Sequence, residues 1–171
     1  MVRVARFEKV SLRRFVADWV ATFPQQTVEQ AVAAYERIRL PERATSGSAG
    51  YDLFAPVGFE LGAGESIKIP TGLRVLIEEG WVLTIYPRSG LGFKYRFQLD
   101  NSVGVIDSDY ARSDNEGHIF MRMTNDSREG KTLIVPSGTA FAQGIFLPFG
   151  ITVDDHAQGV RNGGLGSTTG H

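Results

Sequence analysis

Two segments of the chain combine an arginine with hydroxyl side chains and glycine, which is the chemistry of phosphate binding. One is the segment 87–92, which holds Arg88 and Ser89, and the other is the C-terminal stretch 159–171, which holds Arg161. The arginine fork donates to phosphate oxygens, and glycine lets the backbone N–H approach them closely. Taken alone, the first segment is more typical of an ordinary surface turn and the second of a flexible tail.

Two further segments carry carboxylates beside apolar residues. Asp107 and Asp109 follow the apolar run 103–106 and precede Tyr110. A carboxylate in this position can act as a general base toward water or hold a metal ion through oxygen. Asp52 stands between apolar neighbours, where an Asp is usually a cap, a turn residue or an ion-pair partner. An Asp-rich turn with a packed tyrosine would explain 107–110 as well, so the order of the segments must decide.

Composition excludes several kinds of chemistry. The chain has 171 residues with 18 Lys and Arg against 19 Asp and Glu, so we expect no stable nucleic-acid partner, which would need a basic face. It has no cysteine, and its three histidines lack metal-ligand spacing, which excludes thiol chemistry and thiolate zinc sites. We read no signal peptide and no membrane-length apolar run, and expect a cytoplasmic protein that does not bind membranes.

Residues 11–39 have the pattern of two amphipathic helices that must be buried. Pro24 separates them, Thr27 and Gln30 have the spacing of a capping box, and Pro41 ends the second. The apolar positions are Leu12, Phe15, Val16, Trp19 and Val20 in the first helix and Val28, Ala31, Val32, Tyr35 and Ile38 in the second. We favour a helical lid packed on the main domain over a partner-binding or DNA-binding helix pair.

From residue 41 onward, short apolar segments alternate with Gly, Pro, Ser and Asp, which is typical of a β-sandwich, jelly roll or barrel. The predicted strands are Ser66–Ile69, Leu73–Glu78, Trp81–Tyr86, Ser102–Ile106, His118–Asn125, Lys131–Val135 and Ala142–Phe149. The last stretch has little apolar surface, so we expect it to be mobile when nothing is bound.

Five of these segments, in this order, resemble the five motifs of the trimeric dUTPases, in the form found in Gram-positive bacteria and their phages. They are Ala49–Leu53, Pro87–Gly92, Gly104–Tyr110, Ala142–Phe146 after Pro136-Ser137-Gly138, and Arg161–Thr168. The resemblance implies an all-β fold, a jelly-roll-like distorted β-barrel with a short N-terminal helical segment. We expect one domain over 1–171, with helices in 11–39, a β core over 40–158 and a tail over 159–171 that closes the active site.

The resemblance also implies a homotrimer that hydrolyses dUTP to dUMP and pyrophosphate, limiting uracil in DNA and supplying dUMP for thymidylate synthesis. Asp107 would be the general base that activates water for attack on the α-phosphorus. Tyr110 would lie under the deoxyribose and leave no room for a ribose 2′-OH. The uracil edge would be read by Asn101, Gly104, Val105 and Ile106, and the phosphates would be held by Arg88, Ser89, Gly90 and Gln143.

The tail and the metal complete this implied site. The tail residues that would close over the nucleotide are Arg161, Leu165, Gly166, Ser167 and Thr168. Mg²⁺ would be held by the triphosphate and waters rather than directly by the protein. Asp52 would support the tail arginine and the waters around the metal.

Three features depart from the common family pattern. Leu165 stands where an aromatic ring usually stacks on uracil, so we expect weaker tail closure and a higher KM. The loop 111–117 is lengthened, and the N-terminal helical segment is an addition. These additions leave room for a regulatory protein partner.

Two alternatives compete with this interpretation. The related dCTP deaminases place a catalytic Glu where this chain has Arg122, and a guanidinium cannot act as that acid and base. A regulatory binding module without catalysis has no need of Asp107. Neither alternative accounts for the residues as well as dUTP hydrolysis does.

Overall fold

β-Strands dominate the part of the chain that the structure, a computed structural model, describes, which is residues 2–163. The strands are β1 (Ala5–Lys9), β2 (Tyr51–Phe54), β3 (Phe59–Leu61), β4 (Ser66–Pro70), β5 (Leu73–Ile77), β6 (Trp81–Pro87), β7 (Phe97–Leu99), β8 (Gly104–Ile106), β9 (Phe120–Asn125), β10 (Leu133–Val135) and β11 (Ala140–Pro148). The helices are α1 (Leu12–Thr22), α2 (Val28–Glu36), α3 (Ser89–Tyr95) and the 3₁₀ helix η1 (Tyr110–Arg112).

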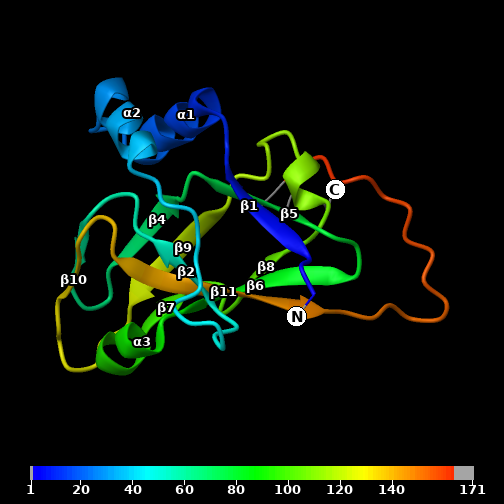
Figure 1. Cartoon of the computed structure of the whole chain (residues 1–171). Helices are drawn as coiled ribbons and strands as arrows, with labels where there is room; N and C mark the ends of the chain where they lie inside the picture. The colour runs from blue at the N-terminus through cyan, green and yellow to red at the C-terminus, as the bar shows by residue number, and fades with distance from the viewer. Residues whose placement is uncertain (1, 164–171) are drawn as a thin grey trace.

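The strands form antiparallel sheets that are layered around one apolar core (Figure 1). One sheet has the order β2-β11-β6-β8 and another β4-β9-β7, while β1 pairs with β5 and β10 with β3. The longest strand, β11, runs between β2 and β6 and pairs with both. The prediction of an all-β, jelly-roll-like fold with short N-terminal helices is confirmed.

The N-terminal helices pack on this core. Phe15 and Trp19 of α1 are fully buried in the same cluster as the strand side chains, and the predicted capping box of Thr27 and Gln30 is present. The structure corrects the predicted burial of the apolar positions at the ends of the two helices. Leu12 and Val28 are exposed, because each lies in the first turn of its helix, and Ile38 is buried beyond the end of α2.

The structure also corrects the predicted strands. It contains β1, β2, β3 and β7, which the sequence pattern did not predict, and the segment after Arg88 forms helix α3. Ser102 has a φ of 66° in the turn before β8, so that strand begins later than predicted. His118 likewise belongs to the loop before β9 rather than to the strand. Within residues 2–163, no helix is long and apolar enough to cross a membrane.

Candidate functional site

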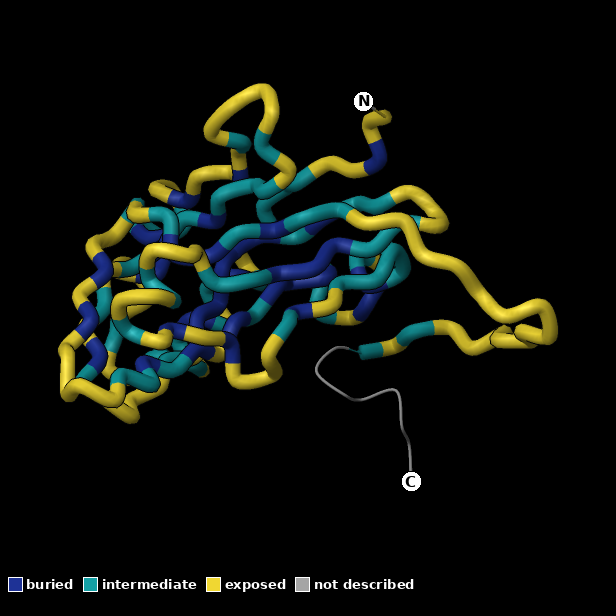
Figure 2. Tube along the Cα trace, turned by 90° about the horizontal axis from the view of Figure 1, so that it is seen from below, coloured by how far each residue is buried: buried dark blue, intermediate teal, exposed yellow. Residues whose placement is uncertain are grey.

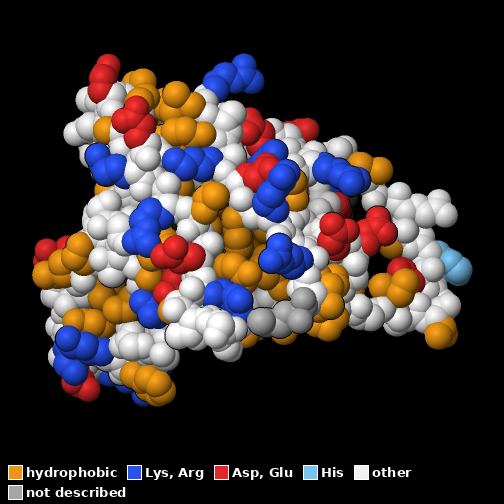
Figure 3. Space-filling model, in the orientation of Figure 1, with side chains coloured by type: hydrophobic (Ala, Val, Ile, Leu, Met, Phe, Trp, Pro, Cys, Tyr) orange, Lys and Arg blue, Asp and Glu red, His pale blue; other side chains and the backbone are white. Residues whose placement is uncertain are grey.

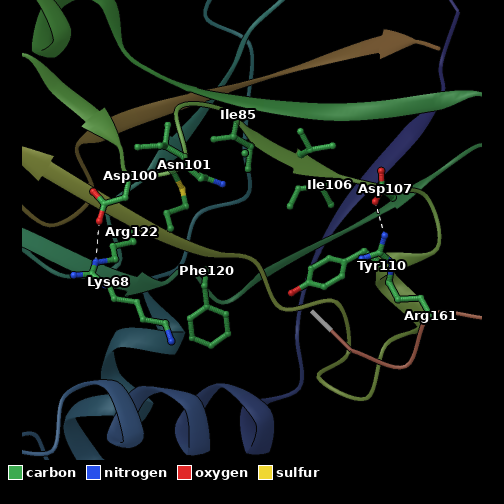
Figure 4. A pocket seen from close by; sticks show the side chains of 14 residues that line it. Lys68, Ile85, Asp100, Asn101, Ile106, Asp107, Tyr110, Phe120, Arg122 and Arg161 are labelled. Atoms are coloured by element: carbon green, nitrogen blue, oxygen red, sulfur yellow. Dashed lines mark hydrogen bonds and ion pairs between the residues drawn. The ribbon is translucent and has the colours of Figure 1, made fainter. Parts of the chain in front are cut away.

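A pocket of about 580 Å³ opens beside the turn 100–106, which leads from β7 into β8 and is called the hairpin below. The two strands lie in different sheets, because β7 pairs with β9 and β8 pairs with β6. The hairpin contributes the predicted base-reading residues to its lining: Asn101, Gly104, Val105 and Ile106. Gly104 lies so close to β6 that a Cβ there would be 3.1 Å from the Cβ of Ile85. This close approach keeps β8 against β6 and shapes the inner wall of the pocket (Figure 4).

The predicted general base lies at the end of the same hairpin. Asp107 follows β8 and, like Tyr110 in η1, lines the pocket. Arg161 reaches back from the C-terminal segment, and its guanidinium pairs with Asp107 and, at 2.9 Å from Nε to Oδ1, with Asp109. The same guanidinium lies 5.9 Å from the centre of the Tyr110 ring. The structure therefore brings together the predicted base, the ring predicted to face the sugar, and the tail arginine (Figure 4).

Tyr110 is held by its hydroxyl group. The hydroxyl donates to the carbonyl oxygen of His118 at 2.8 Å and accepts from Nδ2 of Asn115 at 2.9 Å. Burial is the main cause that raises the pKa of the phenol above its ordinary value. Tyr110 is thus a neutral, fixed ring at the pocket wall.

The predicted phosphate-binding residues form a second group at the other end of β6. Nε of Arg88 lies 3.3 Å from Oδ1 of Asp52, and Asp52 is opposite Gln143 in the ladder between β2 and β11. The Gln143 amide donates to the carbonyl oxygen of Pro87 at 3.2 Å, and Ser89 and Gly90 open α3. The group presents a guanidinium, a hydroxyl and an amide, all of which suit phosphate oxygens.

The two groups do not meet within one chain. In the ladder between β6 and β8, Gly104 is paired with Ile85 and Ile106, next to Asp107, is paired with Leu83. Arg88 lies beyond the end of β6, five positions after Leu83. At about 3.3 Å per residue this separation is roughly 16 Å along the strand. Accordingly, none of Asp52, Arg88, Ser89, Gly90 and Gln143 lines the hairpin pocket.

Seven lining residues were not predicted from the sequence: the aliphatic Ile85, Leu99 and Met121, and also Lys68, Asp100, Phe120 and Arg122. Lys68 of β4 is paired with Arg122 of β9, so two positive charges lie side by side. The Asp100 carboxylate is 2.8 Å from Nε of Arg122, and the Phe120 ring centre is 4.8 Å from Nζ of Lys68. These two contacts offset the like charges. Figure 3 shows apolar side chains in the hollow on this face with Lys and Arg around them. The alternation of Lys68 and Arg122 with buried side chains indicates that each belongs to the exposed face of its strand. No feature of the sequence indicates that these two strands are neighbours in a sheet.

The carboxylates do not form a metal cage. Among residues 2–163 no three His, Asp or Glu side chains gather as metal ligands, and Asp52, Asp107 and Asp109 each face an arginine. This donor set suits a cation that arrives with its own phosphate and water ligands. The remaining predicted tail residues, Leu165, Gly166, Ser167 and Thr168, lie outside the described residues.

A jelly-roll-like fold with a hairpin pocket, a carboxylate and the predicted phosphate-binding group fits the class of nucleotide hydrolases. A profile of the dUTPase family matches residues 36–169, and the chain belongs to this family. It is 43% identical over 134 residues to the deoxyuridine 5′-triphosphate nucleotidohydrolase of Lactococcus lactis, covering 77% of this chain and 88% of that one.

Solved structures agree with this assignment. The dUTPase of Streptococcus mutans is 40% identical, has a TM-score of 0.60 and covers 70% of this chain and 91% of its own. The dUTPase of Staphylococcus bacteriophage 80alpha, solved with dUPNHPP, has a TM-score of 0.64 and covers 98% of this chain and 99% of its own. At 18% identity, the phage protein shows the shared fold alone.

Proposed function

We propose how the residues of this chain carry out the dUTP hydrolysis that its family defines. Asp107 accepts the proton of a water that attacks the α-phosphorus, and dUMP and pyrophosphate leave. The observation that carries this proposal is that Asp107 and Tyr110 line one pocket with four residues of the hairpin, namely Asn101, Gly104, Val105 and Ile106. A carboxylate placed in this way contributes about 10²–10⁴-fold to the rate. The reaction removes dUTP from the precursors of DNA and supplies dUMP for thymidylate synthesis.

The hairpin and Tyr110 select the nucleoside. Asn101 and the backbone of Gly104, Val105 and Ile106 hydrogen-bond the uracil edge, and the narrow hairpin excludes a 5-methyl group. Tyr110 packs under the deoxyribose, where a ribose hydroxyl would collide with the ring. Because its hydroxyl has two protein partners, the ring cannot swing away to admit that group.

Phosphate binding falls to the second group and the tail. Arg88, Ser89, Gly90 and Gln143 hold the phosphates, while Asp52 orients Arg88. When a triphosphate binds, its oxygens draw the Arg161 guanidinium from Asp107, which frees the base. The tail residues Leu165, Gly166, Ser167 and Thr168 then close over the nucleotide.

Mg²⁺ accompanies the substrate in this proposal. The fit rests on the carboxylates at the site, which are paired with arginines rather than gathered into a cage. The triphosphate and waters would hold the ion, with Asp52 in contact through water. Bound Mg²⁺ would draw charge from the phosphate oxygens.

A homotrimer would bring the two groups together. The phosphate-binding group of one subunit would face the hairpin pocket of another, since the two lie apart within one chain. The segment 149–160 supports this assembly, because it projects from the molecule as an exposed stretch of chain (Figure 2) and carries four exposed apolar side chains. These are Phe149, Ile151, Val153 and Val160. Cytoplasmic location and a regulatory protein partner stay predictions.

The decisive experiment measures pyrophosphate release from dUTP, dTTP, UTP and dCTP, with Mg²⁺ and with a chelator. Release from dUTP alone, faster with Mg²⁺, is expected. Equal release from dTTP or UTP would contradict the roles of the hairpin and of Tyr110. Ammonia released from dCTP would favour the deaminase alternative.

A further inference from the structure

The loop 113–118 supplies both partners of the Tyr110 hydroxyl. Asn115 donates to it, and the carbonyl oxygen of His118 accepts from it. The ring of Tyr110 lines the pocket (Figure 4), so any shift of the loop would move a wall of the nucleotide site. The loop is therefore joined to the site through one hydroxyl group.

The loop is folded tightly against η1. Oδ1 of Asn115 accepts from the backbone N–H of Gly117 at 3.1 Å, which orients the amide toward Tyr110. Gly117 has a φ of +71°, and a Cβ there would lie 2.5 Å from Cα of Ala111. Only glycine fits this position, so the geometry of the loop is built into its sequence.

Helix α1 holds the loop from the outside. The Glu116 carboxylate accepts from the backbone N–H of Ser11 at 2.7 Å and from its hydroxyl at 2.6 Å. Arg14 donates to the carbonyl oxygen of Asp114 at 3.2 Å. Both contacts tie the first turn of α1 to the loop.

A buried histidine makes the third tie. Nε2 of His118 accepts from the backbone N–H of Gly72 at 2.8 Å, so the proton of the neutral ring is on Nδ1 and is donated to Asp18 at 2.6 Å. The His118 side chain is fully buried, and its ring lies 4.5 Å from that of Phe120. Since Phe15 and Trp19 anchor α1 in the core, the chain of contacts from the core to Tyr110 is continuous.

We propose that α1 and the loop 113–118 act as a brace that fixes Tyr110, with Asn115, His118 and Asp18 as positioning residues for discrimination between deoxyribose and ribose. The proposal rests on the proposed contact of Tyr110 with the sugar. It gives the lengthened loop and the added helix one shared role, that of keeping the pocket too narrow for a 2′-hydroxyl group.

The test is the ratio of kcat/KM for dUTP to that for UTP. Asn115→Asp keeps the oxygen that accepts from Gly117 but removes the N–H donated to Tyr110, and Tyr110→Phe keeps the ring but removes the hydroxyl. Each variant is expected to turn over UTP faster and so to lower the ratio. The expected decrease is about 3- to 10-fold, which is the range set by one net hydrogen bond. The double variant should lower it no further than Tyr110→Phe alone, because both act through one hydroxyl.

Two comparisons separate positioning from general stability. Asp114→Asn alters an exposed side chain in the same loop and should leave the ratio unchanged. Asp18→Ala should lower the ratio, while Asp18→Asn should restore it, because an amide oxygen can still accept from Nδ1 of His118. A merely structural role would reduce turnover of both nucleotides equally and leave the ratio intact.

The outcomes are distinguishable. Wild-type protein that does not hydrolyse dUTP would overturn the proposed function itself. Suppose instead that the wild-type protein prefers dUTP over UTP. If the Asn115→Asp and Tyr110→Phe variants then keep the wild-type ratio of kcat/KM, the brace is overturned and the proposed function stands.

Discussion

Asp107 carries both the proposed chemistry and an ion pair with Arg161. Asp107→Asn keeps the shape of the side chain but cannot accept the proton of water. We expect dUTP turnover to fall at least about 100-fold, with nucleotide binding retained. Pyrophosphate release and equilibrium binding of a non-hydrolysable dUTP analogue measure the two effects. The matched control is Asp154→Asn, at an exposed position outside the site. If Asp107→Asn left dUTP turnover unchanged, Asp107 would be ruled out as the general base.

Arg88 faces Asp52, and we propose that its guanidinium fork binds phosphate. Arg88→Lys keeps the charge but loses the paired N–H donors, and hydrogen bonds to charged groups contribute about 1.5–3 kcal/mol. We therefore expect KM for dUTP to rise by about 10- to 100-fold. Steady-state kinetics check this, with exposed Arg128→Lys as the control. An unchanged KM would remove Arg88 from the phosphate-binding group.

At the scale of elements, α1 depends on two aromatic side chains. Phe15→Ala should lower the free energy of unfolding by about 3–5 kcal/mol, because it opens a cavity at a fully buried position. Leu12→Ala, in the same helix but exposed, should cost under about 1 kcal/mol. Urea unfolding of both variants measures the difference. Equal losses would mean that α1 is not anchored through Phe15.

His118 links α1, the loop 113–118 and the turn before β5. Burial lowers the pKa of its ring below the ordinary value of 6.5, against the opposing effects of Asp18 and Glu116, while Arg14 adds to the lowering. As pH drops from about 6.5 toward the lowered pKa of the folded state, the unfolded chain binds more protons than the folded one, so the free energy of unfolding should fall over that interval. His118→Gln should flatten this slope in urea titrations, and exposed His156→Gln should not. Equal slopes in both variants would exclude His118 as the origin.

Elements with local signals were predictable from the sequence, and those that depend on distant partners were not. The capping box at Thr27 and the alternation in β4 and β9 lie within short windows, and both are present as predicted. β1 was missed because it pairs only with β5, nearly 70 positions away, and has no strong alternation of its own. β3 and β7 are three residues long, too short to show a period.

The same division applies to the site. Its predicted residues were found by their resemblance to family motifs, and the structure brings the hairpin residues together in one pocket and the phosphate-binding residues in another group. Lys68 and Arg122 were missed because their place in the pocket depends on the pairing of β4 with β9. The tie between Glu116 and Ser11 spans 105 positions and carries no motif.

At the scale of the whole molecule, the proposed sharing of each site between two subunits can be tested by mixing two inactive variants. Asp107→Asn and Arg88→Ala subunits should each be inactive alone, because one lacks the base and the other the phosphate fork. In mixed trimers, the intact hairpin of one subunit meets the intact phosphate-binding group of another.

Random mixing of the two variants in equal amounts should restore about one quarter of the sites, since each half-site is intact in half of the subunits. The measurement is dUTP turnover after the two variants are unfolded together and refolded, against each variant refolded alone. Recovery of turnover requires that subunits of the two variants assemble into the same trimer. The control is therefore a mixture of the two variants that were folded and assembled separately, which should stay inactive. Absence of recovery in the refolded mixture, with trimers present by light scattering, would place both groups of each site within one chain and contradict the shared site.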